Sequence, residues 1–81
     1  MYFVYILRDK FKKNYIGYTE DIDRRFLEHK RGKVKTTKNM VDIQLYYYEA
    51  YPNLEMAQER EQRLKQFGSS YSGLMKRIGL K

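Results

Sequence analysis

The first apolar segment of the chain is Tyr2–Leu7, where aromatic, β-branched and aliphatic side chains follow one another without a polar interruption. Such a run is typical of a strand that is covered on both faces. The polar residues 8–13 then predict a hairpin turn, although they lack the Asn-Gly or Asp-Gly pair that would specify its type. Residues 14–19 form the returning strand. Gly17 within it indicates either a position where a side chain would be in the way or one that needs a positive φ.

A helix is predicted over residues 22–30, immediately after the second strand. Thr19 and Asp21 are suitable N-caps, and the start of the helix is acidic, as the helix dipole favours. Arg25 and His29 lie four residues apart, so they share one face of this helix with apolar side chains. A purely structural helix would keep a core-facing stripe apolar. The cation and the imidazole therefore indicate a polar site.

Aromatic residues mark a third strand, which is predicted over residues 43–50. Asn53 is expected to cap the helix that follows, over residues 54–67. The small and polar residues 68–70 should end that helix.

The end of the chain predicts one more short helix, over residues 71–78, capped by Ser70 and ended by Gly79. The resulting order is β-β-α-β-α-α, which indicates an α+β fold. No internal repeat or low-complexity tract interrupts it, and 81 residues suffice for one small core. We therefore expect a single domain over residues 1–81.

One carboxylate falls on the stripe of the 54–67 helix that should face the core. Spacings of three and four residues assign five positions to that stripe: Leu54, Ala57, Glu61, Leu64 and Gly68. A carboxylate in such a position costs several kcal/mol unless a partner compensates it. Glu61 is therefore interpreted either as a metal ligand or as half of an ion pair with Arg25, Arg60 or Lys65. A helix rotated enough to expose Glu61 is the remaining possibility.

The chain is strongly basic, with 17 Lys and Arg against 10 Asp and Glu and a formal net charge of +7. This charge favours a polyanionic partner, with solubility as the simpler explanation. Residues 30–39 contain five cations and no acid: Lys30, Arg31, Lys33, Lys35 and Lys38. This segment is either a solvated linker or an arm that contacts phosphates. We prefer the second interpretation because Lys and Thr interleaved with Gly can follow a nucleic-acid backbone.

The absence of cysteine excludes a disulfide framework and a cysteine-based zinc site. No segment is apolar for long enough to span a bilayer, and the first residues lack the features of a signal peptide. We therefore expect a soluble, cytoplasmic protein with no membrane association. Nine tyrosines are present, and tyrosine can fill a core, stack on a base or take part in proton transfer.

Together these residues suit the hydrolysis of a phosphodiester. Arg25 would neutralise charge that develops on the phosphoryl oxygens. Glu61 would hold one hydrated Mg²⁺ or Mn²⁺, since Mg²⁺ tolerates a single protein ligand beside waters and substrate oxygens. A tyrosine or His29 would accept a proton from the attacking water. Because the pKa of free tyrosine is near 10, a tyrosine would need nearby positive charge to act as the base.

The chain resembles the GIY-YIG nuclease domain, in particular the small single-domain bacterial YhbQ/YazA-like (UPF0213-like) group. Phe3-Val4-Tyr5 stands at the first motif of the family, with phenylalanine in place of its glycine, and Tyr15-Ile16-Gly17 stands at the second. Residues 21–29 resemble the helix that carries the catalytic arginine of the family. Residues 57–65 resemble the later helix with its metal-binding glutamate. The four motifs occur in the family order and span nearly the whole chain.

The resemblance implies a three-stranded antiparallel sheet flanked by helices and a metal-dependent endonuclease activity on nucleic acid, with DNA as the expected substrate. Such an activity would suit DNA repair or recombination. The matched positions assign catalytic roles to Tyr5, Tyr15, Arg25, His29 and Glu61, with Glu61 as the ligand of Mg²⁺ or Mn²⁺. Two other function classes stay open. One is a nucleic-acid-binding module without catalysis, and the other is a protein-interaction domain whose charge serves solubility.

Overall fold

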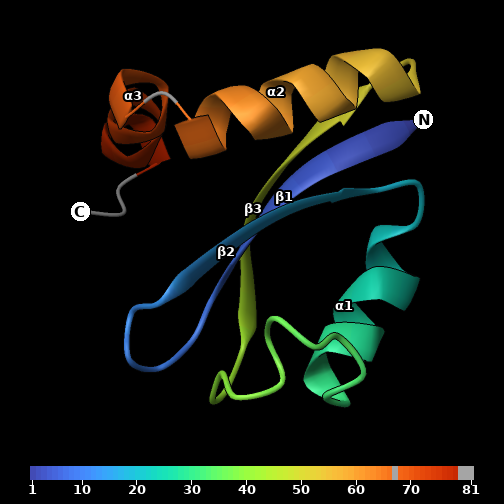
Figure 1. The fold of residues 1–81 in the computed structure, drawn as a ribbon, viewed down its shortest axis with the longest axis vertical. Coiled ribbons are helices and arrows are strands. Elements are labelled where there is room, and N and C mark those ends of the chain that lie inside the picture. Colours follow the sequence, from blue (N-terminus) through green and yellow to red (C-terminus); the bar gives the residue numbers. More distant parts are fainter. Residues whose placement is uncertain (67, 79–81) are drawn as a thin grey trace.

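A computed structural model describes residues 1–66 and 68–78, which form three strands and three helices (Figure 1). In chain order they are β1 (Tyr2–Arg8), β2 (Asn14–Thr19), α1 (Ile22–Lys30), β3 (Gln44–Tyr51), α2 (Leu54–Gln66) and α3 (Gly68–Ile78). The order β-β-α-β-α-α and the antiparallel sheet confirm the predicted α+β fold.

The sheet has the strand order β2-β1-β3, so β1 is its central strand and pairs antiparallel with both neighbours. In this register Tyr5 lies opposite Gly17 on β2 and Tyr48 on β3. Figure 1 shows α1 on one side of the sheet and α2 and α3 on the other. The apolar run of β1 is therefore covered on both faces, as its composition predicted.

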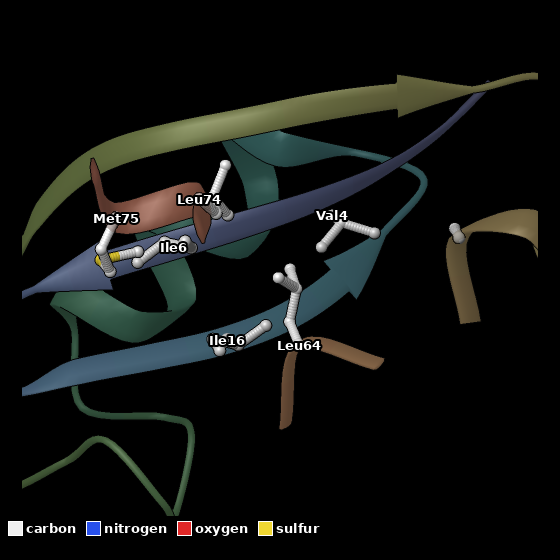
Figure 2. Close-up of a cluster of buried hydrophobic side chains, with 7 residues drawn as sticks. Val4, Ile6, Ile16, Leu64, Leu74 and Met75 are labelled. Atoms are coloured by element: carbon white, nitrogen blue, oxygen red, sulfur yellow. The ribbon is translucent and has the colours of Figure 1, made fainter. Parts of the chain in front are cut away.

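Side chains of β1 alternate between two hydrophobic clusters, one on each face of the sheet. The cluster under α2 and α3 contains Val4, Ile6, Ile16, Ala57, Leu64, Leu74 and Met75 (Figure 2). The cluster on the α1 side contains Tyr5, Leu7 and Ile43, with Tyr15 and Phe26 among the partly buried residues packed against it. This alternation follows from the two-residue period of a strand. It places the tyrosines of the two strand motifs on the α1 face.

A polar cluster fixes α2 against the outer strand of the sheet. The Glu49 carboxylate on β3 accepts hydrogen bonds from Nε and Nη2 of Arg60 on α2, at 2.9 and 3.1 Å. It also accepts hydrogen bonds from the hydroxyls of Tyr47 and Tyr51. Burial alone would raise the pKa of Glu49, but these hydrogen bonds outweigh it and lower that pKa. The cluster therefore holds a charged carboxylate and sets the position of α2 over the sheet.

The hairpin between β1 and β2 is organised by the buried side chain of Asp9. Its Oδ1 accepts the backbone N–H groups of Phe11 and Lys13, both at 2.9 Å, and its Oδ2 accepts that of Val41 at 3.4 Å. Lys12 adopts a positive φ of 66° within this turn. Asp9 thereby takes the place of the Asn-Gly or Asp-Gly pair that the sequence lacks, and it ties the hairpin to the segment before β3.

Three boundaries differ from the sequence predictions. The last helix begins at Gly68, so the prediction that Ser70 caps a helix starting at residue 71 is wrong. Gly and Ser have low helix propensity, but the packing of Leu74 and Met75 into the core outweighs it. The third strand lies one residue later than predicted. Phe67 and Gly79, predicted to end the two helices, lie outside the described residues. Asn53 caps α2 as expected, with its Oδ1 accepting the Met56 N–H.

Candidate active site

Tyr5 lies at the centre of β1 and is 3% exposed. Its ring occupies the space that a side chain at Gly17 would fill, because a Cβ on Gly17 would lie 2.6 Å from Oη and 2.8 Å from Cζ of Tyr5. The φ of Gly17 is not positive. Of the two explanations that the sequence left open for this glycine, lack of space is therefore correct.

His29, in the last turn of α1, is 1% exposed and both of its ring nitrogens are engaged. Nε2 lies 2.9 Å from the Tyr5 hydroxyl, and Nδ1 lies 2.6 Å from the Thr37 hydroxyl. The centre of the Tyr15 ring is 5.0 Å from that of His29 and 6.2 Å from that of Tyr5. Tyr5, Tyr15 and His29 thus form one aromatic group between the sheet and α1.

Burial makes the neutral forms of Tyr5 and His29 dominant at neutral pH. It lowers the pKa of His29 to about 4, with a further contribution from the charge of Arg25. It also raises the pKa of Tyr5 to about 12, with Tyr15 adding to the rise and the Arg25 guanidinium opposing it. Because His29 is enclosed and neutral, it can reach a water molecule only through Tyr5.

Arg25 provides a permanent positive charge at the rim of this aromatic group. Its Nη1 donates to Oε1 of Glu28 at 3.0 Å, and 36% of its side chain is exposed. This hydrogen bond raises the pKa of Arg25, and the interaction with Tyr5 adds to the rise. The neighbouring Arg24 is exposed, as expected for a solvated helix residue. The side chain of Arg25 therefore lies between the buried aromatic group and solvent.

Glu61 approaches the same group from α2, beyond the edge strand β2. Its Oε2 lies 3.2 Å from Nζ of Lys65, which in turn lies 5.9 Å from the centre of the Tyr15 ring. The negative charge of Glu61 also contributes to the raised pKa of Tyr5. Arg25 and Glu61 thus come from helices on opposite faces of the sheet, and the charges of both affect the pKa of Tyr5.

The alternatives considered for Glu61 can be compared with its surroundings. It pairs with Lys65, whereas Arg60 pairs with Glu49 and Arg25 pairs with Glu28. The side chain of Glu61 is 14% exposed, between the buried Ala57 and Leu64 and the solvated face of α2. Leu54 is 38% exposed, so its assignment to the inward stripe is wrong. The inward stripe of α2 therefore runs through Ala57, Glu61 and Leu64, and Gly68, also predicted for it, belongs to α3.

The donor set at Glu61 fits a cation that keeps most of its water. Within residues 1–66 and 68–78, no three side chains of His, Asp or Glu come together as a metal cage. Glu61 would therefore be a single carboxylate ligand, which is the mode that hydrated Mg²⁺ accepts. Lys65 is 46% exposed on a flexible side chain, so it can leave the carboxylate to a cation.

The basic segment after α1 is packed more closely than a linker would be. All five of its cations are exposed: Lys30, Arg31, Lys33, Lys35 and Lys38. Between them, however, Val34 is 8% and Thr37 0% exposed, and the N–H of Thr37 donates to the carbonyl of Val34. A linker solvated along its whole length would not bury these two side chains, so the segment is partly packed against the domain, and its contact with phosphates stays a prediction. Sequence reasoning missed Thr37, and the only signal for burial here was one apolar residue among five cations.

A surface cavity of about 570 Å³ lies elsewhere, at the hairpin, with Arg8, Lys10, Lys12 and Tyr46 in its wall. It contains none of the five predicted catalytic residues. Tyr18, on the same strand as Tyr15, is exposed and accepts a hydrogen bond from Gln58 instead of joining the aromatic group. The candidate site is thus defined by its side chains and not by this cavity.

The family of the GIY-YIG catalytic domain matches residues 1–74 of the chain. This chain belongs to the GIY-YIG family. It is 33% identical over 67 residues to a UPF0213 protein of Haloquadratum walsbyi, covering 82% of this chain and 75% of that protein. It is 34% identical over 67 residues to one of Staphylococcus saprophyticus, covering 82% of each. The family explains why the two strand motifs and the two helices meet as they do.

A solved structure shares the fold. The solution structure of a UPF0213 protein from Bacillus halodurans superposes with a TM-score of 0.59 at 32% identity, covering 96% of this chain and 85% of that one. This likeness to a UPF0213 protein agrees with the group that the sequence motifs indicated. In the part of the chain that the structure describes, no helix combines the length and the apolar character needed to cross a membrane.

Proposed function

We propose that this GIY-YIG domain is a divalent-metal-dependent endonuclease that hydrolyses phosphodiester bonds of DNA. The observation that carries the proposal is the cluster of Tyr5, Tyr15 and His29, with Arg25 on the helix of His29 and Glu61 paired with Lys65, whose Nζ lies 5.9 Å from the centre of the Tyr15 ring. A purely structural core has no need for these charged side chains beside a buried tyrosine–histidine pair.

Each of these residues suits one part of the reaction. The Arg25 guanidinium, partly exposed beside the tyrosines, would bind the scissile phosphate and neutralise charge on its oxygens. Glu61 would hold Mg²⁺ or Mn²⁺, and the ion would supply positive charge to the phosphate and to the leaving oxygen. Tyr15, half-buried between Lys65 and His29, would border the point of attack.

We assign acceptance of the proton from the attacking water to the Tyr5 hydroxyl. A tyrosine with a pKa of about 12 is protonated at neutral pH, so it can accept a proton only if its own proton leaves at the same time. His29 Nε2 lies 2.9 Å from that hydroxyl and is neutral, so it can take this proton. His29 acts through Tyr5, since its Nε2 is engaged by the Tyr5 hydroxyl and its Nδ1 by that of Thr37.

Binding of the substrate is assigned to the exposed cations of the segment after α1. Contacts between exposed cations and phosphates carry no sequence information, so we expect sequence-tolerant, salt-sensitive binding. The cations are Lys30, Arg31, Lys33, Lys35 and Lys38. If all five contact phosphates of a duplex, log affinity should fall with log salt with a slope of about −4.5. Replacing Lys35 by methionine should reduce the slope by about one unit.

The test is nicking of supercoiled plasmid and of branched DNA in Mg²⁺, in Mn²⁺ and in EDTA. Arg25→Met and Glu61→Gln should each lower the rate by about 10²- to 10³-fold. Arg24→Met and Glu59→Gln are matched controls, since Arg24 is exposed on the same helix and Glu59 pairs with Arg63 on the solvated face of α2. Both controls should cleave at the wild-type rate.

The same experiment distinguishes the alternatives. Binding that survives EDTA, with no nicking in either metal, would support a nucleic-acid-binding module in which exposed Tyr46 and Tyr48 stack on bases. Absence of both binding and nicking would leave a basic interaction domain. An RNA duplex of the same sequence, run in parallel, tests the choice of DNA as the substrate.

A further inference from the structure

Thr37 is a fully buried polar residue in a segment whose neighbouring side chains are solvated. It is 0% exposed, whereas Lys35, Thr36 and Lys38 are exposed. Its backbone is fixed at both ends, because its N–H donates to the carbonyl of Val34 at 3.1 Å and its carbonyl accepts from the N–H of Met40 at 2.9 Å. The hydroxyl therefore has a defined position.

That position is against the ring of His29. The Thr37 hydroxyl lies 2.6 Å from Nδ1, on the side of the imidazole opposite to the Tyr5 hydroxyl at Nε2. Tyr5, His29 and Thr37 thus form a continuous hydrogen-bonded chain from the central strand to the basic segment. Each of the three residues is buried, and the low polarity of such surroundings strengthens hydrogen bonds.

The chemistry of a neutral imidazole makes the two bonds interdependent. Its two nitrogens comprise one N–H donor and one acceptor, so the partner at Nδ1 determines what Nε2 can do. If Thr37 accepts from Nδ1–H, Nε2 is left with a lone pair and accepts from the Tyr5 hydroxyl. In the other tautomer Nε2 already carries a proton and donates it to the oxygen of Tyr5, so it cannot take the proton of the Tyr5 hydroxyl.

We infer that Thr37 is a positioning residue of the proposed active site: its hydroxyl accepts the Nδ1–H of His29 and so selects the tautomer that receives the proton of Tyr5. The inference rests on the proposed nuclease function for its consequence, but its geometry is independent of that function. Thr37 does not touch the phosphate. It acts by orienting His29, which acts on Tyr5.

A merely structural role for Thr37 makes different predictions. In that case the side chain fills a gap under the basic segment, and Val34 and the backbone hydrogen bonds would anchor the segment equally well. Replacing the hydroxyl by a methyl would then change stability without changing the tautomer of His29. Thr37→Val, which keeps the branched shape, and Thr37→Ser, which keeps the hydroxyl, separate these roles.

The first measurement uses the full-length protein labelled with ¹⁵N and long-range ¹H–¹⁵N correlation of the imidazole. His29 is the only histidine of the chain, so its signals need no assignment by mutation. Wild type and Thr37→Ser should show a protonated Nδ1 and an unprotonated Nε2, and Thr37→Val should show the reverse. A wild-type ring protonated on Nε2, or a Thr37→Val spectrum equal to that of wild type, would overturn the inference.

The second measurement is plasmid nicking with the same three proteins. Thr37→Val should lower kcat by about 10- to 100-fold, as is found for residues that orient a functional imidazole. KM should change by less than roughly twofold because the five cations stay exposed, and Thr37→Ser should restore kcat. Unchanged kcat in Thr37→Val contradicts the inference. If wild type cleaves nothing, the proposed function fails, while the tautomers still decide the role of Thr37. If Thr37→Val does not fold, the wild-type and Thr37→Ser spectra decide it.

Discussion

The contact between Gly17 and Tyr5 predicts that one added methyl group disturbs the whole candidate site. In Gly17→Ala the new Cβ would lie 2.6 Å from Oη and 2.8 Å from Cζ of Tyr5, and 3.0 Å from Cε2 of Tyr15. Ordinary van der Waals contact begins at 3.4 Å, so the Tyr5 hydroxyl must move by about 0.8 Å. Because Tyr5 is buried and bonded to His29, this movement breaks or strains that bond.

The energetic cost follows from two opposing terms. Overpacking of a core site costs typically about 1–3 kcal/mol, whereas replacing glycine by alanine restricts the unfolded chain and stabilises by about 0.4–1 kcal/mol. We expect a net loss of about 1–2 kcal/mol in the free energy of unfolding. For a chain of this size, that loss lowers Tm by about 5–15 °C. Nicking should fall as well, since the Tyr5 hydroxyl no longer meets Nε2.

The assay is urea unfolding followed by circular dichroism, combined with the imidazole spectrum of His29. Gly73→Ala is the matched control, because Gly73 lies within α3 and a Cβ there would meet nothing within 4 Å. That control should gain roughly 0.5–1 kcal/mol from helix propensity. A Gly17→Ala protein as stable as wild type, with an unchanged His29 spectrum, would refute the argument from space.

Three further predictions concern charge. The unfolded chain binds a proton at His29 below the ordinary pKa of 6.5, while the folded chain binds it only near pH 4, so the free energy of unfolding falls as the pH drops from 6.5 to 4. The expected loss is about 3 kcal/mol, and urea unfolding at several pH values measures it. His29→Gln should remove this contribution to the pH dependence. A stability that is flat over this window contradicts the enclosed, neutral imidazole. Arg60→Met leaves the Glu49 carboxylate without its cation and should lower the free energy of unfolding by about 2 kcal/mol. The control Arg63→Met removes an exposed ion pair and should change that free energy by no more than about 0.5 kcal/mol. Equal effects of the two substitutions in thermal unfolding would contradict the role of Glu49. Lys65→Met frees the Glu61 carboxylate, so the Mg²⁺ concentration for half-maximal nicking should fall several-fold, and a rise would indicate that Lys65 itself binds the phosphate.

Much of the fold was predictable because local patterns and tertiary packing agree. The apolar run of β1, the glycine of β2 and the cap of α1 by Asp21 each have a local cause, and the structure has all three. The start of α3 was not predictable from its Gly-Ser-Ser composition, because buried side chains one turn later decide it. Propensity is a weak guide where packing opposes it.

The residues of the candidate site also fall into a group that the sequence predicts and a group that it does not. The helical spacing of Arg25 and His29 and the position of Glu61 on the stripe of α2 follow from periodicity. In the structure His29 bonds Tyr5, and the charges of Arg25 and Glu61 both affect the pKa of Tyr5. No periodicity predicts that Thr37 reaches Nδ1 of His29, because that contact depends on how an irregular segment folds back under α1. Of the three cations considered for Glu61, the structure selects Lys65, which is the i, i+4 partner within α2 that helical periodicity allows.

The alternation of side chains along β1 has a consequence for how this domain tolerates change. Val4 and Ile6 pack beneath α2 and α3, while Tyr5 and Leu7 between them face the α1 side. A slip of one residue in the pairing of β1 would turn every position of the strand to the other face, burying the phenol of Tyr5 among aliphatic chains and presenting an aliphatic side chain to His29. The register of β1 therefore determines the chemistry of the candidate site as well as the packing of the core.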